Sequence, residues 1–559
     1  MTTPEVNSKI FQDLKTWVEK AGGVVHSNIE LRGTTTTTTT TTTSSAATGG
    51  GDQEVVRGIF ATQTISKGEL LLRIPAVLAI SGEKLPRTWK NDRLASPWLR
   101  CLACLYLAQK DDDDDDDEEQ QWKPYIQSLP TSYETLWRWK DDEVRYLSST
   151  ALGETLQADR QEGTLERRMN DYVLPYMKHL KIPTGKDPIR TFQQLSMCLS
   201  TRGFHMQQPP NNNNNNNDSN NNNHANVESK STTTSTPYLG PFLLPVIDLL
   251  NHSADEKLKA TTLQRDSATG DFCMVAERDV NKGEEILHSY GDLTASQLLQ
   301  TFGFVPESTL RRVLSPTDDA AAAATAAVGP KTTATVTTTP AMLSKEVLVA
   351  ACETVKKSSY PKELKITMEE NDLEGEVFEL DDARQRKLDF LPDQFLVTPS
   401  TETGSYLSDE MVTLCCTQML PNEMYSEVFA DEPKQLLGQE VLEDYFLGKL
   451  VAMAILTAIK TKMETYQPLT KVCSDIVEVE ATEDKAILEA MLSLEHRDLS
   501  TYRALYGIAV RLEEKHSLEE LRNEVLAIIA ALDNDDGEEE ENVEGDLKTR
   551  PSKKVKSSE

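Results

Sequence analysis

The chain has 559 residues, a hydrophobic content of 38% and a formal net charge of -32 at pH 7, and this length is enough for about two to four domains. The excess of acidic residues argues against nucleic acid as a partner, because phosphate binding depends on lysine and arginine. No stretch reaches the roughly 18 uninterrupted apolar residues of a membrane-spanning helix, and the N-terminus holds no apolar signal-peptide core. We therefore expect an intracellular protein with no nucleic-acid partner and no membrane partner.

The cysteines predict neither a disulfide framework nor a metal site. Eight cysteines are scattered along the chain, which suits a reducing compartment. Cys101 and Cys104 have the spacing of a metal-binding pair, but they lie in an apolar helical pattern, and a structural zinc site needs a second pair or histidines nearby. We interpret both as core residues and expect no metal.

Low-complexity tracts divide the chain into patterned segments. Such tracts cannot bury enough apolar surface to offset the entropy of ordering them, so we expect them to be surface loops. They cover residues 34–43, 111–117, 211–223, 229–236 and 320–339.

The first patterned segments predict a helix followed by short strands. We expect the helix over residues 7–21 and, after a Gly-Gly stop, a short strand at residues 24–25. Residues 55–61 and 69–75 read as two strands, and the Ser-Lys-Gly-Glu at residues 66–69 supplies turn chemistry between them.

Helical and β-type patterns then alternate along the chain. Residues 92–200 are mostly helical, with apolar residues at spacings of three and four. Residues 238–306 return to short strands and turns, and residues 341–532 are helical again, notably over 441–466 and 499–532. This order predicts an α+β fold, in which a β-rich core is split by a helical insert and followed by a mainly helical C-terminal domain.

These patterns set the expected domain boundaries. We expect residues 1–91 for the N-terminal helix and the first part of the core with a disordered loop at 34–50, 92–205 for the helical insert, 206–237 for an Asn/Ser/Thr loop, 238–310 for the second part of the core, 311–340 for a linker, 341–532 for the C-terminal domain and 533–559 for a disordered tail. The basic cluster at 548–556 in that tail is a candidate nuclear localisation signal, or simply a solvated tail, so we expect a nuclear or cytoplasmic protein.

Two apolar runs end on polar and aromatic residues. Residues 245–253 read PVIDLLNHS, and residues 283–291 read GEEILHSYG, followed by Phe-Gly-Phe at 302–304. Taken alone, Asn-His is typical of a turn after a strand. The two histidines of these runs have no cysteine or carboxylate at ligand spacing, and no Gly-x-Ser-x-Gly elbow of a hydrolase occurs in the chain.

Four ordered stretches resemble the SET-domain protein lysine methyltransferases, specifically the Rubisco large-subunit methyltransferase-like branch. The stretches are RGIFA at 57–61 with SKGE at 66–69 and Ile-Pro at 74–75, STRGF at 200–204, DLLNHS at 248–253, and GEEI through Tyr-Gly to FGFV at 283–305. The resemblance spans roughly residues 5–306, and residues 504–511 share it more loosely. It implies a split SET core and a C-terminal substrate-binding domain.

The resemblance also implies an activity and a cofactor. It implies an S-adenosylmethionine-dependent protein-lysine N-methyltransferase that acts on a lysine side chain of a non-histone protein. We expect the protein to be a monomer. The backbone at Arg57 and Gly58 would pass close to the cofactor, because glycine has no Cβ to clash. Arg202 would face the cofactor's carboxylate. Asn251 would hold its methionine end, and the His252 backbone would contact the adenine edge.

Tyr290 matches the catalytic tyrosine of this family, which also closes the cofactor site, and Phe302 and Phe304 would wall a channel for the lysine stem. Methyl transfer from a sulfonium requires alignment of an amine with the methyl carbon. The amine must be neutral, although free lysine has a pKa of about 10.4. An apolar channel and the nearby sulfonium both disfavour the ammonium form, and a tyrosine hydroxyl can accept a hydrogen bond from the amine.

Two alternatives stay open at this point. One is a histidine methyltransferase, because one branch of the family modifies histidine. The other is a catalytically silent SET scaffold that binds a partner through residues 341–532. The presence of Arg202, Asn251, His252 and Tyr290 argues against the scaffold. No motif identifies the substrate protein.

Overall fold

The computed structural model groups the described part of the chain into two compact units. It describes residues 4–35, 55–85, 96–109, 121–130, 132–207, 238–253, 255, 257–291, 293–314, 339–359, 382–400, 403–420, 425, 428–429, 434–467, 469, 472–473, 478–479, 483–494 and 497–539. By contacts, the first unit comprises Met1–Tyr146, Leu152–Thr337 and Thr470–Ala509, and the second comprises Leu147–Ala151, Thr338–Leu469 and Val510–Glu559. The low-complexity tracts, apart from residues 34–35 and 339, and the basic cluster at 548–556 lie outside the described residues.

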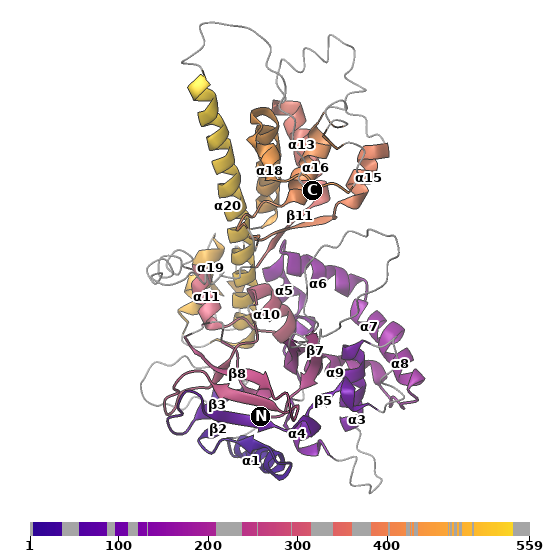
Figure 1. Cartoon of the computed structure of the whole chain (residues 1–559), viewed down its shortest axis with the longest axis vertical. Helices are drawn as coiled ribbons and strands as arrows, with labels where there is room; N and C mark the ends of the chain where they lie inside the picture. Colours follow the sequence, from indigo (N-terminus) through magenta and orange to yellow (C-terminus); the bar gives the residue numbers. More distant parts are fainter. Residues whose placement is uncertain are drawn as a thin grey trace, which may run out of the picture. The chain divides into compact units, whose positions relative to one another are not determined.

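The first unit contains the β-rich part of the fold (Figure 1). A five-stranded sheet has the order β1-β4-β9-β8-β10, a three-stranded sheet has the order β5-β7-β6, and β2 pairs with β3. Only β8 and β10 run parallel among these pairs. The bounds are β1 Val24–Val25, β2 Ile29–Thr35, β3 Val55–Ala61, β4 Leu70–Ile74, β5 Ile80–Ser81, β6 Gly203–Gln207, β7 Tyr238–Leu243, β8 Lys259–Arg265, β9 Phe272–Ala276 and β10 Leu287–His288.

The strands follow the alternation of side chains along an extended chain. In β9, Phe272, Met274 and Ala276 are buried, while the residues between them are half-buried, as expected of a strand with one face on the core. Strand β3 has the predicted bounds 55–61, and β4 lies within the predicted 69–75. Strand β2 was not predicted, and it includes the first two threonines of a low-complexity tract.

Helices fill the sequence between the two β-rich segments. Helix α1 packs on β2, and α3 packs against α9 and β7 (Figure 1). Cys101 and Cys104 of α3 are buried in the core. No group of three or more potential metal ligands occurs among the described residues. The bounds are α1 Pro4–Lys20, α3 Pro97–Gln109, α4 Lys123–Ser128, α5 Asp141–Val144, α6 Ala151–Gln161, α7 Thr164–Arg168, α8 Leu174–His179, α9 Pro188–Arg202, α10 Ala295–Phe302, α11 Glu307–Leu314 and α19 Asp484–Leu492.

Helix α10 is a departure from the strands and turns expected over 238–306. Thr294 begins it as an N-cap: its side chain accepts from the main-chain N–H of Gln297, whose own side chain accepts from the N–H of Thr294. Gly303 ends it in the left-handed region with φ +81°. This reciprocal capping and a glycine at the end are typical helix boundary signals, and they override the surrounding β pattern.

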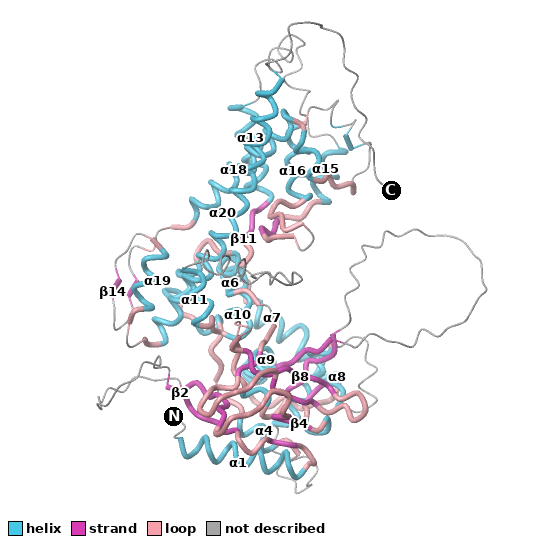
Figure 2. Tube along the Cα trace, turned by 60° about the vertical axis from the view of Figure 1, so that its left-hand side comes forward, coloured by secondary structure: helices cyan, strands magenta, loops and turns pink. Residues whose placement is uncertain are grey.

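The second unit is mainly helical, as predicted. Helices α13, α16 and α18 pack against one another (Figure 2). Helix α18 lies within the predicted range 441–466. A strand pair, β11 with β12, was not predicted. The bounds are α13 Lys345–Ser359, α15 Asp382–Phe390, α16 Asp409–Met419, α18 Tyr445–Thr465, β11 Ala341–Ser344 and β12 Gln394–Val397.

Helix α20, Leu499–Glu539, contributes residues to both units, since the division falls between Ala509 and Val510. It begins where predicted because Asp498 caps it: Asp498 Oδ1 accepts from the Thr501 main-chain N–H at 2.7 Å, which satisfies a first-turn donor. Two short strands, β13 (Val472–Cys473) and β14 (Glu478–Val479), precede it.

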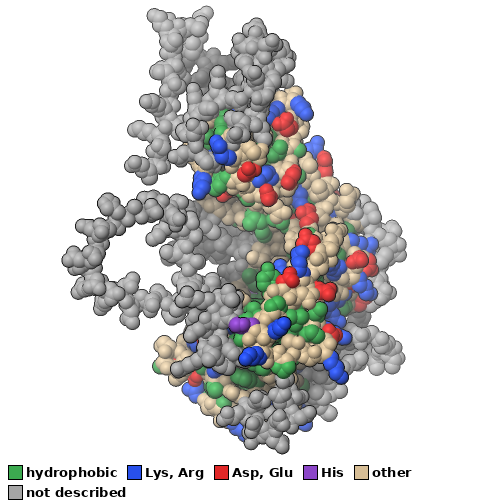
Figure 3. Space-filling view, turned by 90° about the vertical axis from the view of Figure 1, so that its right-hand side faces the viewer, with side chains coloured by type: hydrophobic (Ala, Val, Ile, Leu, Met, Phe, Trp, Pro, Cys, Tyr) green, Lys and Arg blue, Asp and Glu red, His purple; other side chains and the backbone are tan. Residues whose placement is uncertain are grey.

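Charged side chains are mixed on the face drawn in Figure 3. Lysine and arginine alternate with aspartate and glutamate across the coloured residues of this face. Such a mixture differs from the continuous basic surface that binds nucleic acid. None of the described helices combines the length and the apolar character needed to cross a membrane.

Candidate active site

Strand β3 and the segment after the turn Ile247–Leu249 bring Gly58 and Asn251 together. The Asn251 side-chain amide donates to Arg57 O at 3.1 Å and to Glu285 Oε1 at 2.7 Å. A Cβ at Gly58 would overlap Glu285 Oε1 and lie 2.9 Å from Asn251 Nδ2. The absence of a side chain at Gly58 therefore keeps this amide and carboxylate against the strand backbone.

Arg202, at the end of α9, forms an ion pair with Asp248. Its Nη1 donates to Asp248 O at 2.8 Å and to Asp248 Oδ2 at 3.1 Å, and the Tyr125 hydroxyl donates to the same Oδ2 at 3.0 Å. The Asp248 side chain is only 1% exposed. Burial raises the pKa of Asp248, against the opposing effect of the Arg202 charge. Burial disfavours the charged guanidinium of Arg202, but the Asp248 carboxylate overrides this and raises the pKa of Arg202.

The helical insert supplies more of this site. Both terminal nitrogens of Arg57 donate to Ser128 O at 3.2 Å, which ties the end of α4 to β3. Burial, followed by the nearby Arg202 charge, lowers the pKa of Arg57. The Tyr133 side chain interacts with the Cys198 thiol and with the charges of Arg202 and Asp248. Burial raises the pKa of Tyr133, so it stays protonated.

Tyr290 has its hydroxyl oriented by the main chain. The hydroxyl donates to Leu250 O at 2.9 Å, and the Tyr290 N–H donates to His252 Nδ1 at 3.0 Å. Because the hydroxyl proton is directed at Leu250, the oxygen lone pairs remain to accept a hydrogen bond. Burial raises the pKa of Tyr290 to about 12, so the hydroxyl keeps its proton at neutral pH.

His252 is a buried, neutral neighbour of Tyr290. The two rings stack with centroids 5.0 Å apart, and burial lowers the pKa of His252 to about 4. The Ser253 N–H donates to His288 O and the His288 N–H donates to Asn251 O. These two bonds fix the chain on either side of His252 and use none of its own main-chain groups.

Phe302 and Phe304 extend the aromatic cluster around Tyr290. The rings of Tyr290 and Phe302 have centroids 4.7 Å apart, and those of Phe302 and Phe304 are 6.3 Å apart. Both phenylalanines are half-buried. Gly303, which is in the left-handed region, separates the two phenylalanines at the end of α10. We call Phe302 and Phe304 the phenylalanine wall.

A family model for the SET domain matches residues 56–291. The chain carries a SET domain. The match begins in β3 and ends just after Tyr290, so it includes every element of the site except the phenylalanine wall. The resemblance of the motifs between residues 57 and 291 to a SET domain is thereby confirmed.

Known proteins and solved structures are also similar to this chain. N-lysine methyltransferase setd6 of Danio rerio is 25% identical over 264 residues, which are 44% of this chain and 50% of that protein. The actin-histidine N-methyltransferase of Otolemur garnettii is 34% identical over 98 residues, 17% of this chain and 16% of that protein. The structure of the SET domain of LSMT bound to lysine and AdoHcy matches with a TM-score of 0.54 at 15% identity, and it covers 94% of this chain and 93% of that chain.

The matched proteins differ in how much of their length the chain covers. The chain spans about half the length of the first of these relatives. The structural match extends over nearly the whole chain, and at 15% identity it shows the fold. The α+β fold, with a SET core split by helices and a helical C-terminal region, is therefore confirmed.

The structure brings the predicted SET-domain residues into one neighbourhood. The residues that sequence analysis missed fall into two kinds. Asp248 and Glu285 stand inside the quoted motifs, so their acidic side chains were a usable signal. Tyr125 and Tyr133 come from the insert, where nothing in the local pattern distinguishes them from other aromatic residues.

The buried neutral state of His252 predicts a pH dependence of stability. The unfolded histidine takes up a proton below about pH 6.5, whereas the folded one does so only near a pKa of about 4. The contribution of His252 to the free energy of unfolding is therefore complete above pH 6.5. It falls as the pH drops from 6.5 to 4, by about 1.4 kcal/mol per pH unit for one proton.

The variant His252→Asn is expected to remove that slope. An asparagine oxygen can take the place of Nδ1 as acceptor for the Tyr290 N–H, and it does not titrate. Urea unfolding between pH 4.5 and 7 would measure the free energy of unfolding in both proteins. Equal slopes in the wild type and the variant would contradict a buried, neutral His252.

Proposed function

We propose that this protein is an S-adenosylmethionine-dependent protein-lysine N-methyltransferase that acts on a non-histone protein. The observation that carries the proposal is the Tyr290 hydroxyl, which donates to Leu250 O and leaves its lone pairs available beside an aromatic wall. An amine that enters along this wall can donate to that oxygen, which orients the amine lone pair.

The residues around Arg202 suit S-adenosylmethionine. Arg202 Nε, Asp248 Oδ1 and His252 Nε2 are buried, and none of them has a hydrogen-bond partner within the described part of the chain. Buried polar groups normally have partners, so such atoms indicate a place for a polar ligand. The cofactor offers a carboxylate for Arg202, an ammonium group and an adenine. When bound, the cofactor would supply the methyl group from its sulfonium sulfur.

Each predicted cofactor residue has a role in this proposal. The β3 backbone at Arg57 and Gly58 would lie along the cofactor, which the missing Cβ of Gly58 permits. Asn251 would hold the methionine end, and the His252 backbone would contact the adenine edge. Tyr290 would close the site on the methyl side.

The chemistry required of the protein is alignment and desolvation. The phenylalanine wall, Phe302 and Phe304, would pack along the apolar lysine stem and exclude water, which disfavours the ammonium form of the amine. Tyr290 stays protonated because burial raises its pKa to about 12. It can therefore accept a hydrogen bond from the neutral amine and hold it in line with the methyl carbon.

The partner in this proposal is a protein that presents a lysine side chain. We propose the helical region 341–532 as the substrate-binding domain, by likeness to the fold of LSMT. We further propose a monomer, located in the nucleus or cytoplasm, that binds neither nucleic acid nor membrane.

Cofactor binding provides the direct test. The variant Asn251→Ala removes the amide that bonds Arg57 O and Glu285, and we expect it to weaken S-adenosylmethionine binding in calorimetry by about tenfold or more, since a hydrogen bond to a charged group contributes about 1.5–3 kcal/mol. The matched control is Asn281→Ala, because the amide of Asn281 also donates to a glutamate, Glu284, but at an exposed turn. Equal affinities in all three proteins would contradict the assignment of Asn251.

The modified residue distinguishes lysine from histidine methylation. Histidine methylation is the second candidate activity, because 98 residues match an actin-histidine N-methyltransferase. Proteins of the source cell that become labelled from methyl-tritiated cofactor should be analysed by mass spectrometry. Methyl-lysine supports the proposal, and methyl-histidine alone would replace it.

A further inference from the structure

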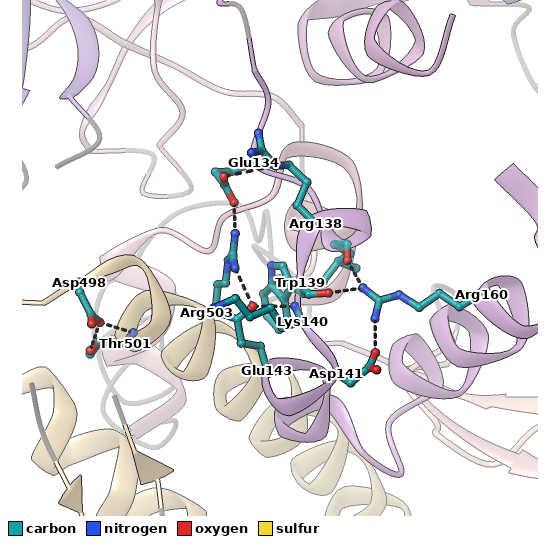
Figure 4. Close-up of polar contacts among 11 residues, drawn as sticks. Glu134, Arg138, Trp139, Lys140, Asp141, Glu143, Arg160, Asp498, Thr501 and Arg503 are labelled. Carbon is teal, nitrogen blue, oxygen red and sulfur yellow. Dashed lines mark hydrogen bonds and ion pairs between the residues drawn. The ribbon is translucent and has the colours of Figure 1, made fainter. Parts of the chain in front are cut away.

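The beginning of α20 is bonded to the helical insert by a buried arginine (Figure 4). Arg503 Nη2 donates to Glu134 Oε2 at 2.6 Å, and Arg503 Nη1 donates to Glu143 Oε2, also at 2.6 Å. The side chain of Arg503 is 9% exposed, that of Glu143 5% and that of Glu134 21%. A largely desolvated guanidinium with two carboxylates fixes the geometry of both far more than an exposed ion pair does.

The two carboxylates belong to one segment, residues 132–143. The rest of this segment is also anchored, because Arg160 donates to Leu136 O at 2.9 Å and to Trp139 O at 2.6 Å (Figure 4). Glu143 stabilises the start of α5 in addition, since its Oε2 accepts from the Lys140 N–H at 2.7 Å. Apart from its bond to Arg503, Glu143 therefore contacts only the helical insert in these bonds.

Glu134, the other partner of Arg503, contacts the turn that carries the phenylalanine wall. Gly303, between Phe302 and Phe304, has φ +81°, and a Cβ built on it would overlap the main-chain oxygen of Glu134 and lie 3.4 Å from Thr135 N. The backbone at Glu134 thus presses directly on the turn that separates the two rings. A shift of Glu134 would displace this turn.

The residue before Glu134 faces the ion-pair cluster of the site. Tyr133 interacts with the Cys198 thiol and with the charges of Arg202 and Asp248. Its side chain packs partly buried against the main core of the first unit. One short stretch, Tyr133 to Thr135, therefore touches both the proposed cofactor side and the proposed amine side.

We propose that Arg503 is a positioning residue for the amine channel: it holds Glu134, and through the Glu134 backbone it holds the turn at Gly303 that carries the phenylalanine wall. This inference rests on the proposed function, because the channel is the one defined there by Tyr290 and Phe302. It assigns the first turns of α20 an indirect part in binding the amine.

The two carboxylates allow a matched test. Glu134→Gln and Glu143→Gln each replace one charged partner of Arg503 by a neutral amide of the same shape, but only Glu134 contacts the channel wall. The probe is free L-lysine, titrated by calorimetry into the full chain saturated with S-adenosylhomocysteine. Unfolding in urea is measured for each variant alongside.

We expect Glu134→Gln to weaken L-lysine binding by about fivefold or more, which is within the range of coupling between residues in one network. Glu143→Gln should leave that affinity unchanged, and both variants should bind S-adenosylhomocysteine like the wild type. Arg503→Lys, which keeps the charge and loses the fork, should behave like Glu134→Gln. A merely structural bridge predicts instead that the two glutamine variants lose stability and leave L-lysine affinity equal.

Two results would overturn the inference in different ways. If Glu134→Gln and Arg503→Lys bind L-lysine as the wild type does, or if Glu143→Gln weakens binding equally, Arg503 does not act through Glu134. If the wild type binds no S-adenosylhomocysteine, the proposed function itself fails and the positioning role fails with it.

Discussion

Replacing Arg202 by methionine is expected to lower the free energy of unfolding by about 3–5 kcal/mol, the range observed when one partner of a buried ion pair is removed. The Asp248 carboxylate, 1% exposed, would lose its main countercharge. It would keep the hydrogen bond from the Tyr125 hydroxyl at 3.0 Å and the weaker effect of the Arg57 charge. Burial raises the pKa of Asp248, and the variant lacks the Arg202 charge that opposes this effect. Urea unfolding at neutral pH measures the loss.

A second substitution separates the buried charge from general damage. In Arg202→Met with Asp248→Asn the uncompensated carboxylate is gone, so part of the lost stability should return. The comparison variant is Arg311→Met. Arg311 pairs with Glu307 on α11 with 61% of its side chain exposed, and its loss should change stability by about 1 kcal/mol or less. A loss of similar size in both arginine variants would contradict the role assigned to Asp248.

Replacing Tyr290 by phenylalanine is expected to lower kcat for methyl transfer by about 10²-fold, the effect of losing alignment of the reacting groups. The ring contacts to Phe302 and His252 remain in the variant, so the fold and the cofactor affinity should change little. Transfer of tritiated methyl groups to proteins of the source cell, measured against time, gives the ratio of rates.

Tyr106→Phe is a matched control for that experiment. The Tyr106 hydroxyl also donates to a main-chain carbonyl, Pro183 O, at 2.8 Å, but it lies between α3 and the segment after α8, away from the site. Its loss should leave the rate unchanged. If both tyrosine variants transfer methyl groups at the wild-type rate, Tyr290 is not the catalytic residue.

Much of the β core was predictable because its information is local. Alternation of side chains marks β3 and β9, and the turn residues at 66–69 separate two strands. The Asp498 cap sets the start of α20 at the predicted residue. The prediction of strands and turns was wrong at α10, and the reason is also local. A single capping pair, Thr294 with Gln297, outweighs the β-type pattern of the longer segment around it.

The site was only partly predictable. Asn251, Tyr290 and the phenylalanine wall stand in ordered motifs, so their family resemblance located them. Their hydrogen-bond partners were not visible in the same way. Asn251 bonds Glu285 and the Arg57 carbonyl, and Tyr290 bonds the Leu250 carbonyl. Main-chain acceptors carry no sequence signal, and their positions depend on how distant segments pack.

The sequence by itself determined the fold class, the split of the β-rich core and the motif residues, because periodicity, capping and ordered motifs are properties of neighbouring residues. Only the tertiary structure decided that Tyr125 and Tyr133 of the insert face Arg202, and that Arg503 reaches back over more than 300 residues, with sequence separations of 360 to Glu143 and 369 to Glu134. Such pairs arise from the packing of whole elements, and no local pattern records which partners that packing brings together.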